Sequence, residues 1–138
     1  MRAKNLEKLG ETIDTILEHA LDKAGEYLAD AMHDTIEYQH QSWTPLKPST
    51  IRRKGHDKIL IDTGELMGSI DYKQQEDFVK VGVFGKRAYI GAVHEFGAPS
   101  RNIPERSFIR STFKDEKKKI EKMIGDTVRQ SIRRFTIR

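Results

Sequence analysis

The feature that most constrains the fold of this chain is a long amphipathic pattern at its N-terminal end. Apolar or small residues recur at steps of three and four, and charged residues fall between them. The residues on this stripe are Leu6, Leu9, Ile13, Ile16, Leu17, Ala20, Ala24, Leu28, Ala31 and Thr35. The spacing predicts one helix from roughly Asn5 to Gln39, and that helix would be about 50 Å long if unbroken.

A helix of that length is longer than the domain that should contain it. The chain has 138 residues, which we interpret as a single domain, residues 1–138, with a diameter of roughly 35 to 40 Å. We therefore expect the helix to extend beyond its own domain, to bend, or to pack on a neighbour. Gly25 is the expected position of a bend.

The remaining periodicity predicts an α+β fold. A second helical stripe extends from Ile109 to Phe135, and its last turns carry arginines that include Arg138. The stretch "SIDYKQQEDFVKVGVFG" alternates apolar and polar residues around "QQED", which predicts two antiparallel strands in a hairpin. The segment from Ala88 is typical of either a strand or a short helix. We therefore expect a long N-terminal helix and a C-terminal helix packed on a small antiparallel sheet.

Composition and spacing argue against an enzyme or a metalloprotein. The chain has no cysteine, so thiolate metal sites and disulfides are not available. The segment "VHEFGA" has Ala98 where a zinc-binding "HExxH" helix has its second histidine. We therefore interpret His94 as a partly buried packing residue and Glu95 as a surface or interface charge. No segment approaches the length of a membrane span, and we expect a soluble protein with no catalytic site, metal or cofactor.

The stretch "LIDTGEL" supports two hypotheses. Asp-Thr-Gly surrounds the catalytic aspartate of aspartic proteases, where two carboxylates share a proton, so a chain with one copy would have to dimerise about Asp62. The alternative is a helix start, in which Asp62 is the N-cap and Glu65 completes a capping box. We favour this capped turn, formed by Asp62, Thr63, Gly64 and Glu65.

Two basic clusters leave nucleic-acid binding as the alternative function. The chain has 25 basic and 21 acidic residues, a formal net charge of +4, which is too mild to indicate a nucleic-acid partner by itself. The basic excess lies in "IRRKGHDK", with Arg52, Arg53 and Lys54, and in the tail from Lys114 to Arg138. We favour a solvated basic surface over phosphate contacts.

A rigid loop precedes the first basic cluster. Pro45 and Pro48 hold "SWTPLKPST" extended, and Trp43 and Leu46 offer large apolar side chains. The segment could be a contact between subunits, or Trp43 could fill the domain's own core. We expect Ser49 or Thr50 to cap a short helix that follows.

Four segments taken in order resemble the bacteriophage virion-morphogenesis and tail-completion proteins. They are "WTPLKPSTIRRKG" (residues 43–55), "LIDTGELMGSI" (60–70), "VGVFGKRAYIGAVHEFGA" (81–98) and "IPERSFIRSTF" (103–113). We call these segments the four blocks, which cover about half of the chain. Two positions depart from the family's pattern: Ala88 precedes Tyr89 where the family has alanine after tyrosine, and Ser107 stands where proline is common.

The resemblance implies a non-enzymatic structural protein that completes or joins the tail at the head-tail interface. It also implies a ring of identical subunits, contacts with other head-tail connector or tail proteins, and a location in the neck or tail of the virion after assembly in the host cytoplasm. We expect subunit contacts along the N-terminal helix and near residues 43–46 and 95–110. The candidates are Trp43, Pro45, Leu46, Glu95, Phe96, Arg106 and Phe108.

Overall fold

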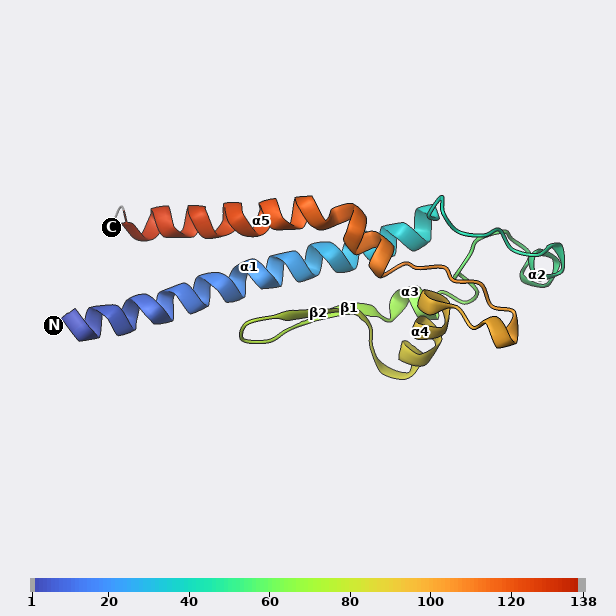
Figure 1. Cartoon of the computed structure of the whole chain (residues 1–138), viewed down its shortest axis with the longest axis horizontal. Helices are drawn as coiled ribbons and strands as arrows, with labels where there is room; N and C mark the ends of the chain where they lie inside the picture. Colours follow the sequence, from blue (N-terminus) through green and yellow to red (C-terminus); the bar gives the residue numbers. More distant parts are fainter. Residues whose placement is uncertain (1, 137–138) are drawn as a thin grey trace.

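Two long antiparallel helices form the frame of the molecule (Figure 1). The structure is a computed structural model that describes residues 2–136, so the predicted place of Arg138 in the last turns of the C-terminal helix lies outside the described residues. Helix α1 spans Arg2–Tyr38 and helix α5 spans Arg110–Thr136. The predicted N-terminal and C-terminal helices are therefore confirmed, because a helical period sustained over so many turns is a strong local signal.

A hairpin packs against α1 (Figure 1). Strands β1 (Ile70–Gln74) and β2 (Val79–Val83) pair antiparallel, with Tyr72 opposite Val81. The N–H of Gln75 donates to the carbonyl oxygen of Phe78 at 2.8 Å and closes the turn. The predicted α+β fold, with two long helices and a small antiparallel sheet, is confirmed.

Gly25 allows the hairpin to approach α1 closely. A Cβ atom at this position would lie 2.5 Å from Cγ2 of Val79 and 2.8 Å from Cδ2 of Tyr72, both far inside van der Waals contact. Helix α1 is continuous through this residue, so the chain stays helical there, and the expected bend at Gly25 stays a prediction. The glycine makes room for two strand side chains.

The hydrophobic core lies along the second half of α1. Buried residues of α1 meet Trp43 and Ile59 from the following loops, and Phe108 and Ile120 from the C-terminal part of the chain. The first part of α1 lies outside this core: Leu6 is 67% exposed and Ile13 is 51% exposed. The helix therefore extends beyond its own core, which is one of the three outcomes that its length predicted.

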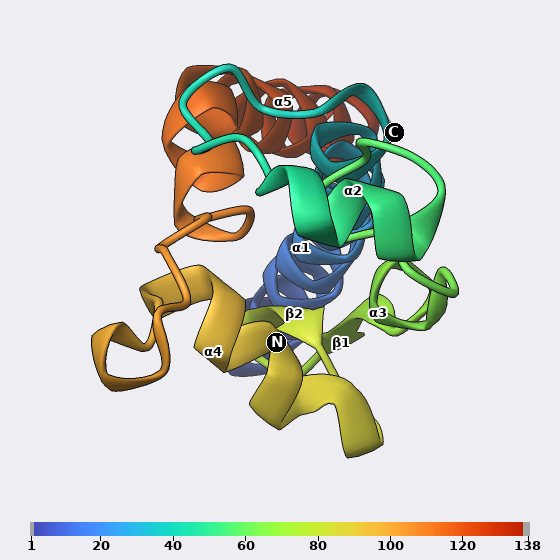
Figure 2. The same ribbon diagram turned by 90° about the vertical axis from the view of Figure 1, so that its right-hand side faces the viewer.

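Short helices gather toward the end of the helical pair that is opposite the chain termini (Figures 1 and 2). They are α2 (Pro48–Lys54), α3 (Glu65–Gly68), α4 (Ala88–Phe96) and the 3-10 turns η1 (Gly85–Arg87) and η2 (Pro99–Arg101). The segment that could have been a strand or a helix is therefore the helix α4. We call this end of the molecule the head.

The starts of α2 and α3 differ from the predictions. Helix α2 begins at Pro48 with Lys47 as its N-cap residue, so Ser49 and Thr50 lie inside the helix and neither caps it. A proline at the first helical position lacks an N–H, so no donor is left without a partner there.

The predicted capping box at Asp62 and Glu65 is also wrong. Helix α3 begins at Glu65, and its N-cap residue is Gly64 at φ 85°, with no side-chain capping bond. The hydroxyl of Thr63 accepts a long hydrogen bond, 3.4 Å, from the N–H of Glu65. Asp62 instead lies 3.8 Å from Arg53 as an ion pair. Glycine adopts a positive φ readily, and that conformation moves the Asp62 side chain away from the helix start.

Candidate functional site

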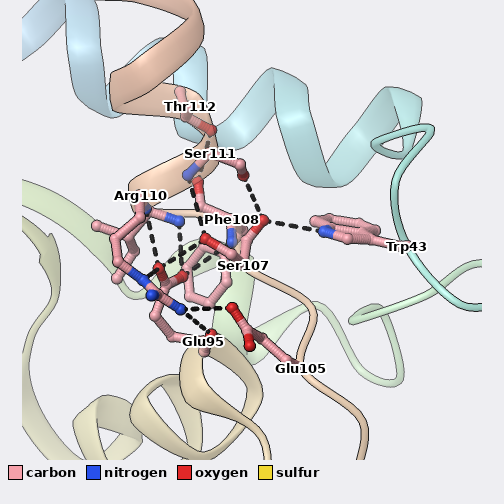
Figure 3. A network of polar contacts seen from close by, with 9 residues as sticks. Trp43, Glu95, Glu105, Ser107, Phe108, Arg110, Ser111 and Thr112 are labelled. Atoms are coloured by element: carbon pink, nitrogen blue, oxygen red, sulfur yellow. Dashed lines mark hydrogen bonds and ion pairs between the residues drawn. The ribbon is translucent and has the colours of Figure 1, made fainter.

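Helix α5 begins beside a buried carboxylate that comes from α4 (Figure 3). Glu95 is only 2% exposed. Its Oε2 accepts hydrogen bonds from the backbone N–H groups of Phe108 (2.9 Å) and Ile109 (2.8 Å). Its Oε1 accepts from the backbone N–H of Arg110 (2.9 Å) and from the hydroxyl of Ser107 (2.8 Å). Glu95 therefore satisfies amide donors that the first turn of a helix leaves without intrahelical partners.

Burial and hydrogen bonding change the pKa of Glu95 in opposite directions. Burial raises the pKa of a carboxyl group, because the charged form loses hydration. The backbone donors of Ile109 and Arg110, with the side chains of Ser107 and Arg110, stabilise the ionised form and outweigh burial, so the pKa lies below the ordinary glutamate value. The positive end of the α5 dipole favours the same charge. The carboxylate is therefore ionised at neutral pH.

Arg110 binds the same carboxylate from the first turn of α5. Its Nε donates to Oε1 of Glu95 at 2.9 Å. Its Nη2 donates at 2.8 Å to the backbone carbonyl oxygen of Glu95 and at 2.8 Å to Oε1 of Glu105. The guanidinium carbon lies 4.6 Å from the ring centroid of Phe96, a stacking contact that arginine favours. These contacts hold the end of α4 against the start of α5.

Two further contacts attach the loop after α1. The indole N–H of Trp43 donates to the backbone carbonyl oxygen of Ser107 at 2.9 Å. The guanidinium of Arg106 donates to the carbonyl oxygens of Thr44 (3.0 Å) and Pro45 (3.4 Å). The Glu95 junction, as we name this network, consists of Trp43, Glu95, Arg106, Ser107 and Arg110.

The Glu95 junction positions segments of the chain rather than offering a reactive group. Its carboxylate is surrounded by donors of the protein itself, whereas a general base must reach a proton of a substrate. Among residues 2–136, no group of three or more His, Asp or Glu side chains could hold a metal ion. In the same part of the chain, no helix is long and apolar enough to cross a membrane.

A groove of about 730 Å³ lies beside the junction, and residues of all four blocks line it. Its cationic side chains are Lys47, Arg53, Lys54, Arg87, Arg101 and Arg106. Its two carboxylates are each paired already: Asp62 with Arg53, and Glu65 with Arg87. The lining therefore carries an excess of positive charge, and we call it the basic groove.

Burial and neighbouring positive charge lower the pKa of two members of the basic groove. The Nδ1 atom of His94 is buried and has no hydrogen-bond partner in the described part of the chain. Burial lowers the pKa of His94, and Arg106 and Lys54 lower it further. Burial also lowers the pKa of Lys54, with a smaller contribution from Arg53 and Arg106 against the opposing effect of Asp62. The chain itself therefore leaves part of this charge without compensation.

The seven residues expected at subunit contacts fall into two groups. Four of them are at most 7% exposed: Trp43, Glu95, Arg106 and Phe108. The prediction that Glu95 is a surface or interface charge is therefore wrong, because amide donors of α5 hold it in the interior. Of the two alternatives for Trp43, the structure supports the core residue. The other three are at least partly accessible: Pro45, Leu46 and Phe96.

The two basic clusters lie far apart. Helix α2, with Arg52 and Arg53, belongs to the head, whereas the last turns of α5 lie at the opposite end of the molecule (Figure 1). Lys54 donates to the carbonyl oxygen of Lys58 at 2.6 Å, and Arg129 pairs with Asp126 at 2.6 Å. The alternative of one nucleic-acid surface built from both clusters therefore gains no support from the fold.

Two members of the junction, Ser107 and Arg110, do not follow from the sequence reasoning. The sequence marks Ser107 only as a departure from the family's proline, although its hydroxyl donates to Glu95 and accepts from the N–H of Ser111 at 3.1 Å. A serine just before an amphipathic stripe is a recognised signal of a helix start. No comparable signal points to Glu95, because it lies 13 residues before Phe108.

Comparison with known proteins gives two matches. The model of the phage virion morphogenesis family matches residues 3–132, which include the helical pair as well as the head. An uncharacterized protein of Methanocaldococcus jannaschii is 32% identical over 124 residues, which cover 83% of this chain and 89% of that protein. No solved structure matches the chain.

Proposed function

The chain belongs to the phage virion morphogenesis family, and on this premise we propose that it completes or joins the tail at the head-tail interface of a phage particle. It works there as a ring of identical subunits and contacts head-tail connector or tail proteins. The observation that carries the proposal is the family match over residues 3–132. The four blocks, which resemble tail-completion proteins in particular, support the finer assignment.

The shape of the chain supports this role. A subunit that joins two parts of a particle needs a rigid head and a surface for its neighbours. The Glu95 junction supplies the rigidity, because its buried carboxylate connects α4 to the start of α5, and the indole of Trp43 attaches the loop after α1 to Ser107. The first half of α1 supplies the surface, since it extends beyond the core with Leu6 and Ile13 exposed.

The exposed members of the predicted contact set also support it. Phe96 is 63% exposed, and Arg110 stacks on its ring. Pro45 and Leu46 follow Trp43, whose indole fixes the loop to the core. Aromatic and arginine side chains on rigid supports contribute much of the binding energy at protein interfaces. These residues are further candidate contacts for subunits or connector proteins.

A phage that encodes this chain allows a direct test. A nonsense mutation early in the gene should yield separate heads and tails, or particles with incomplete tails, in electron micrographs, and the lysate should lose infectivity. Expression of the wild-type chain in the host should restore intact particles. Tailed and infective virions in the absence of the protein would refute the proposal.

A further inference from the structure

A stripe of carboxylates lies on the part of α1 that extends beyond the core. Glu7, Glu11, Asp14 and Glu18 are all exposed, and their spacing of four, three and four residues puts them on one side of the helix over roughly 16 Å. No ion pair of the described part of the chain includes any of them. We call residues 6–18 the acidic arm.

The acidic arm also carries apolar side chains beside its carboxylates. Leu6, Leu9, Ile13 and Leu17 are between 36% and 67% exposed. Like charges four residues apart destabilise a helix, and exposed leucines gain nothing from solvent. Both features would be favourable against a surface that is basic and partly apolar.

The basic groove is such a surface. Two of its six cations are paired with Asp62 and Glu65, and the other four form no ion pair with a carboxylate in the described residues: Lys47, Lys54, Arg101 and Arg106. Apolar side chains of Leu46, Leu60 and Ile103 line the same groove. The groove therefore offers Lys47, Lys54 and Arg101, beside the buried Arg106, and an apolar lining to the four carboxylates and four apolar residues of the arm.

The arm and the groove cannot meet within one molecule. The arm lies at the end of α1 near both termini, and the groove lies in the head at the other end (Figure 1). We infer that the acidic arm of one copy docks in the basic groove of the next copy. Such a contact joins two different surfaces, so it is heterologous and closes a ring when the rotation between copies allows it. The inference rests on the proposed ring and names its contact.

Charge reversal tests the contact in the full-length chain. Lys47 and Arg101 are exposed, so Lys47→Glu with Arg101→Glu should not disturb folding, yet it should weaken self-association at least about tenfold. Glu11→Lys with Asp14→Lys should weaken it similarly. The variant with all four changes should associate again, because the two new lysines of the arm can pair with the two new glutamates of the groove. Sedimentation velocity measures the mass of the species that each variant forms in solution.

A control matched to the groove variant keeps its change in net charge but leaves both surfaces intact. Lys114→Glu with Lys118→Glu alters two exposed residues of α5 and should leave association unchanged. The wild-type association should weaken as salt rises from about 0.05 M to about 0.5 M, because exposed charges are screened. Circular dichroism of every variant verifies that the helices are retained.

Three results would overturn the contact. They are a wild-type chain that is monomeric at every concentration, a groove variant that assembles like the wild type, and a four-change variant that stays monomeric while each pair disrupts. None of them refutes the proposed function, since a head-tail subunit can assemble on other proteins. The nonsense mutation in the phage decides that question separately.

Discussion

At the start of α5, Glu95 adds a capping carboxylate from another helix to the local contact that Ser107 makes with Ser111. Its carboxylate accepts from three consecutive backbone N–H groups, those of Phe108, Ile109 and Arg110. A capping side chain normally reaches one such donor. One side chain of α4 therefore fixes both where α5 begins and how it meets the head.

Glu95→Gln should destabilise the protein strongly. The amide keeps the size of the side chain but removes the charge, and its NH₂ group must face donors such as the N–H of Arg110. We expect a loss of about 3 kcal/mol in the free energy of unfolding, measured by urea denaturation. Glu105→Gln is the control, because this carboxylate also pairs with Arg110 but is 57% exposed, and we expect about 0.5 kcal/mol. Equal losses for the two variants would contradict the role of Glu95.

The same carboxylate makes the free energy of unfolding depend on pH. The pKa of Glu95 is lower in the folded state than the ordinary value of 4.5, so the folded chain binds this proton less readily than the unfolded chain. Its contribution is fully present above pH 4.5 and is lost as the pH falls through the lower, folded pKa.

Unfolding of the wild type and of Glu95→Gln between about pH 3 and pH 7 measures this contribution. His94 adds a separate decrease in the free energy of unfolding as the pH falls below its ordinary pKa of 6.5, since its folded pKa is also lowered. Glu95→Gln should therefore keep the decrease near pH 6 and lose the one below pH 4.5. If Glu95→Gln lost stability below pH 4.5 as steeply as the wild type, another carboxylate would be responsible for that loss.

At the scale of the elements, helix α1 and the hairpin meet where α1 lacks a side chain. Two glycines of α1 have opposite surroundings. A Cβ atom added at Gly10 would have nothing within 4 Å, whereas one added at Gly25 would meet Val79 at 2.5 Å and Tyr72 at 2.8 Å. Helix propensity favours alanine over glycine equally at both positions. The difference in stability between alanine variants at the two sites therefore measures the cost of packing a Cβ atom at Gly25.

We expect Gly10→Ala and Gly25→Ala to change stability in opposite directions. The first should raise the free energy of unfolding by up to about 1 kcal/mol. The second should lower it by about 1 kcal/mol, because overpacking against Val79 and Tyr72 outweighs the gain in propensity. Thermal and urea unfolding of the two variants measure the difference. If Gly25→Ala stabilises the chain as much as Gly10→Ala, the hairpin does not need this close approach.

The elements were predictable to the extent that their signals are local. The stripes of α1 and α5 and the alternation of the hairpin predict the α+β fold, because each period is contained in its own segment. The start of α3 was not predictable in the same way, since Gly64 at φ 85° determines which side chains can reach the helix. The site was less predictable still: Glu95 acts on amides 13 to 15 residues further on, and only folding brings them together.

At the scale of the whole molecule, the acidic arm and the core should differ in local stability. The core half of α1 contains Met32 at 1% exposure and Ile36 at 0%, whereas Leu6 in the arm is 67% exposed. Helix ends that bury little apolar surface open at low free energy, and core helices open at nearly the global value. In the monomer, amide hydrogen exchange should therefore slow steadily along α1 from the arm to the core.

Assembly should slow amide hydrogen exchange in the arm and leave exchange in the core nearly unchanged. When the arm docks in a neighbour's basic groove, its amides become protected, while the core amides near Met32 and Ile36 change little because they already exchange slowly. Hydrogen exchange at low and high protein concentration compares the two states, and the variant with Lys47→Glu and Arg101→Glu gives the undocked reference. Slower exchange in residues 6–18 on concentration, absent from that variant, is the expected result. If concentration slowed exchange only at Phe96 and the loop after Trp43, the contact between subunits would lie on the head surface instead, and the arm would remain available to other proteins of the particle.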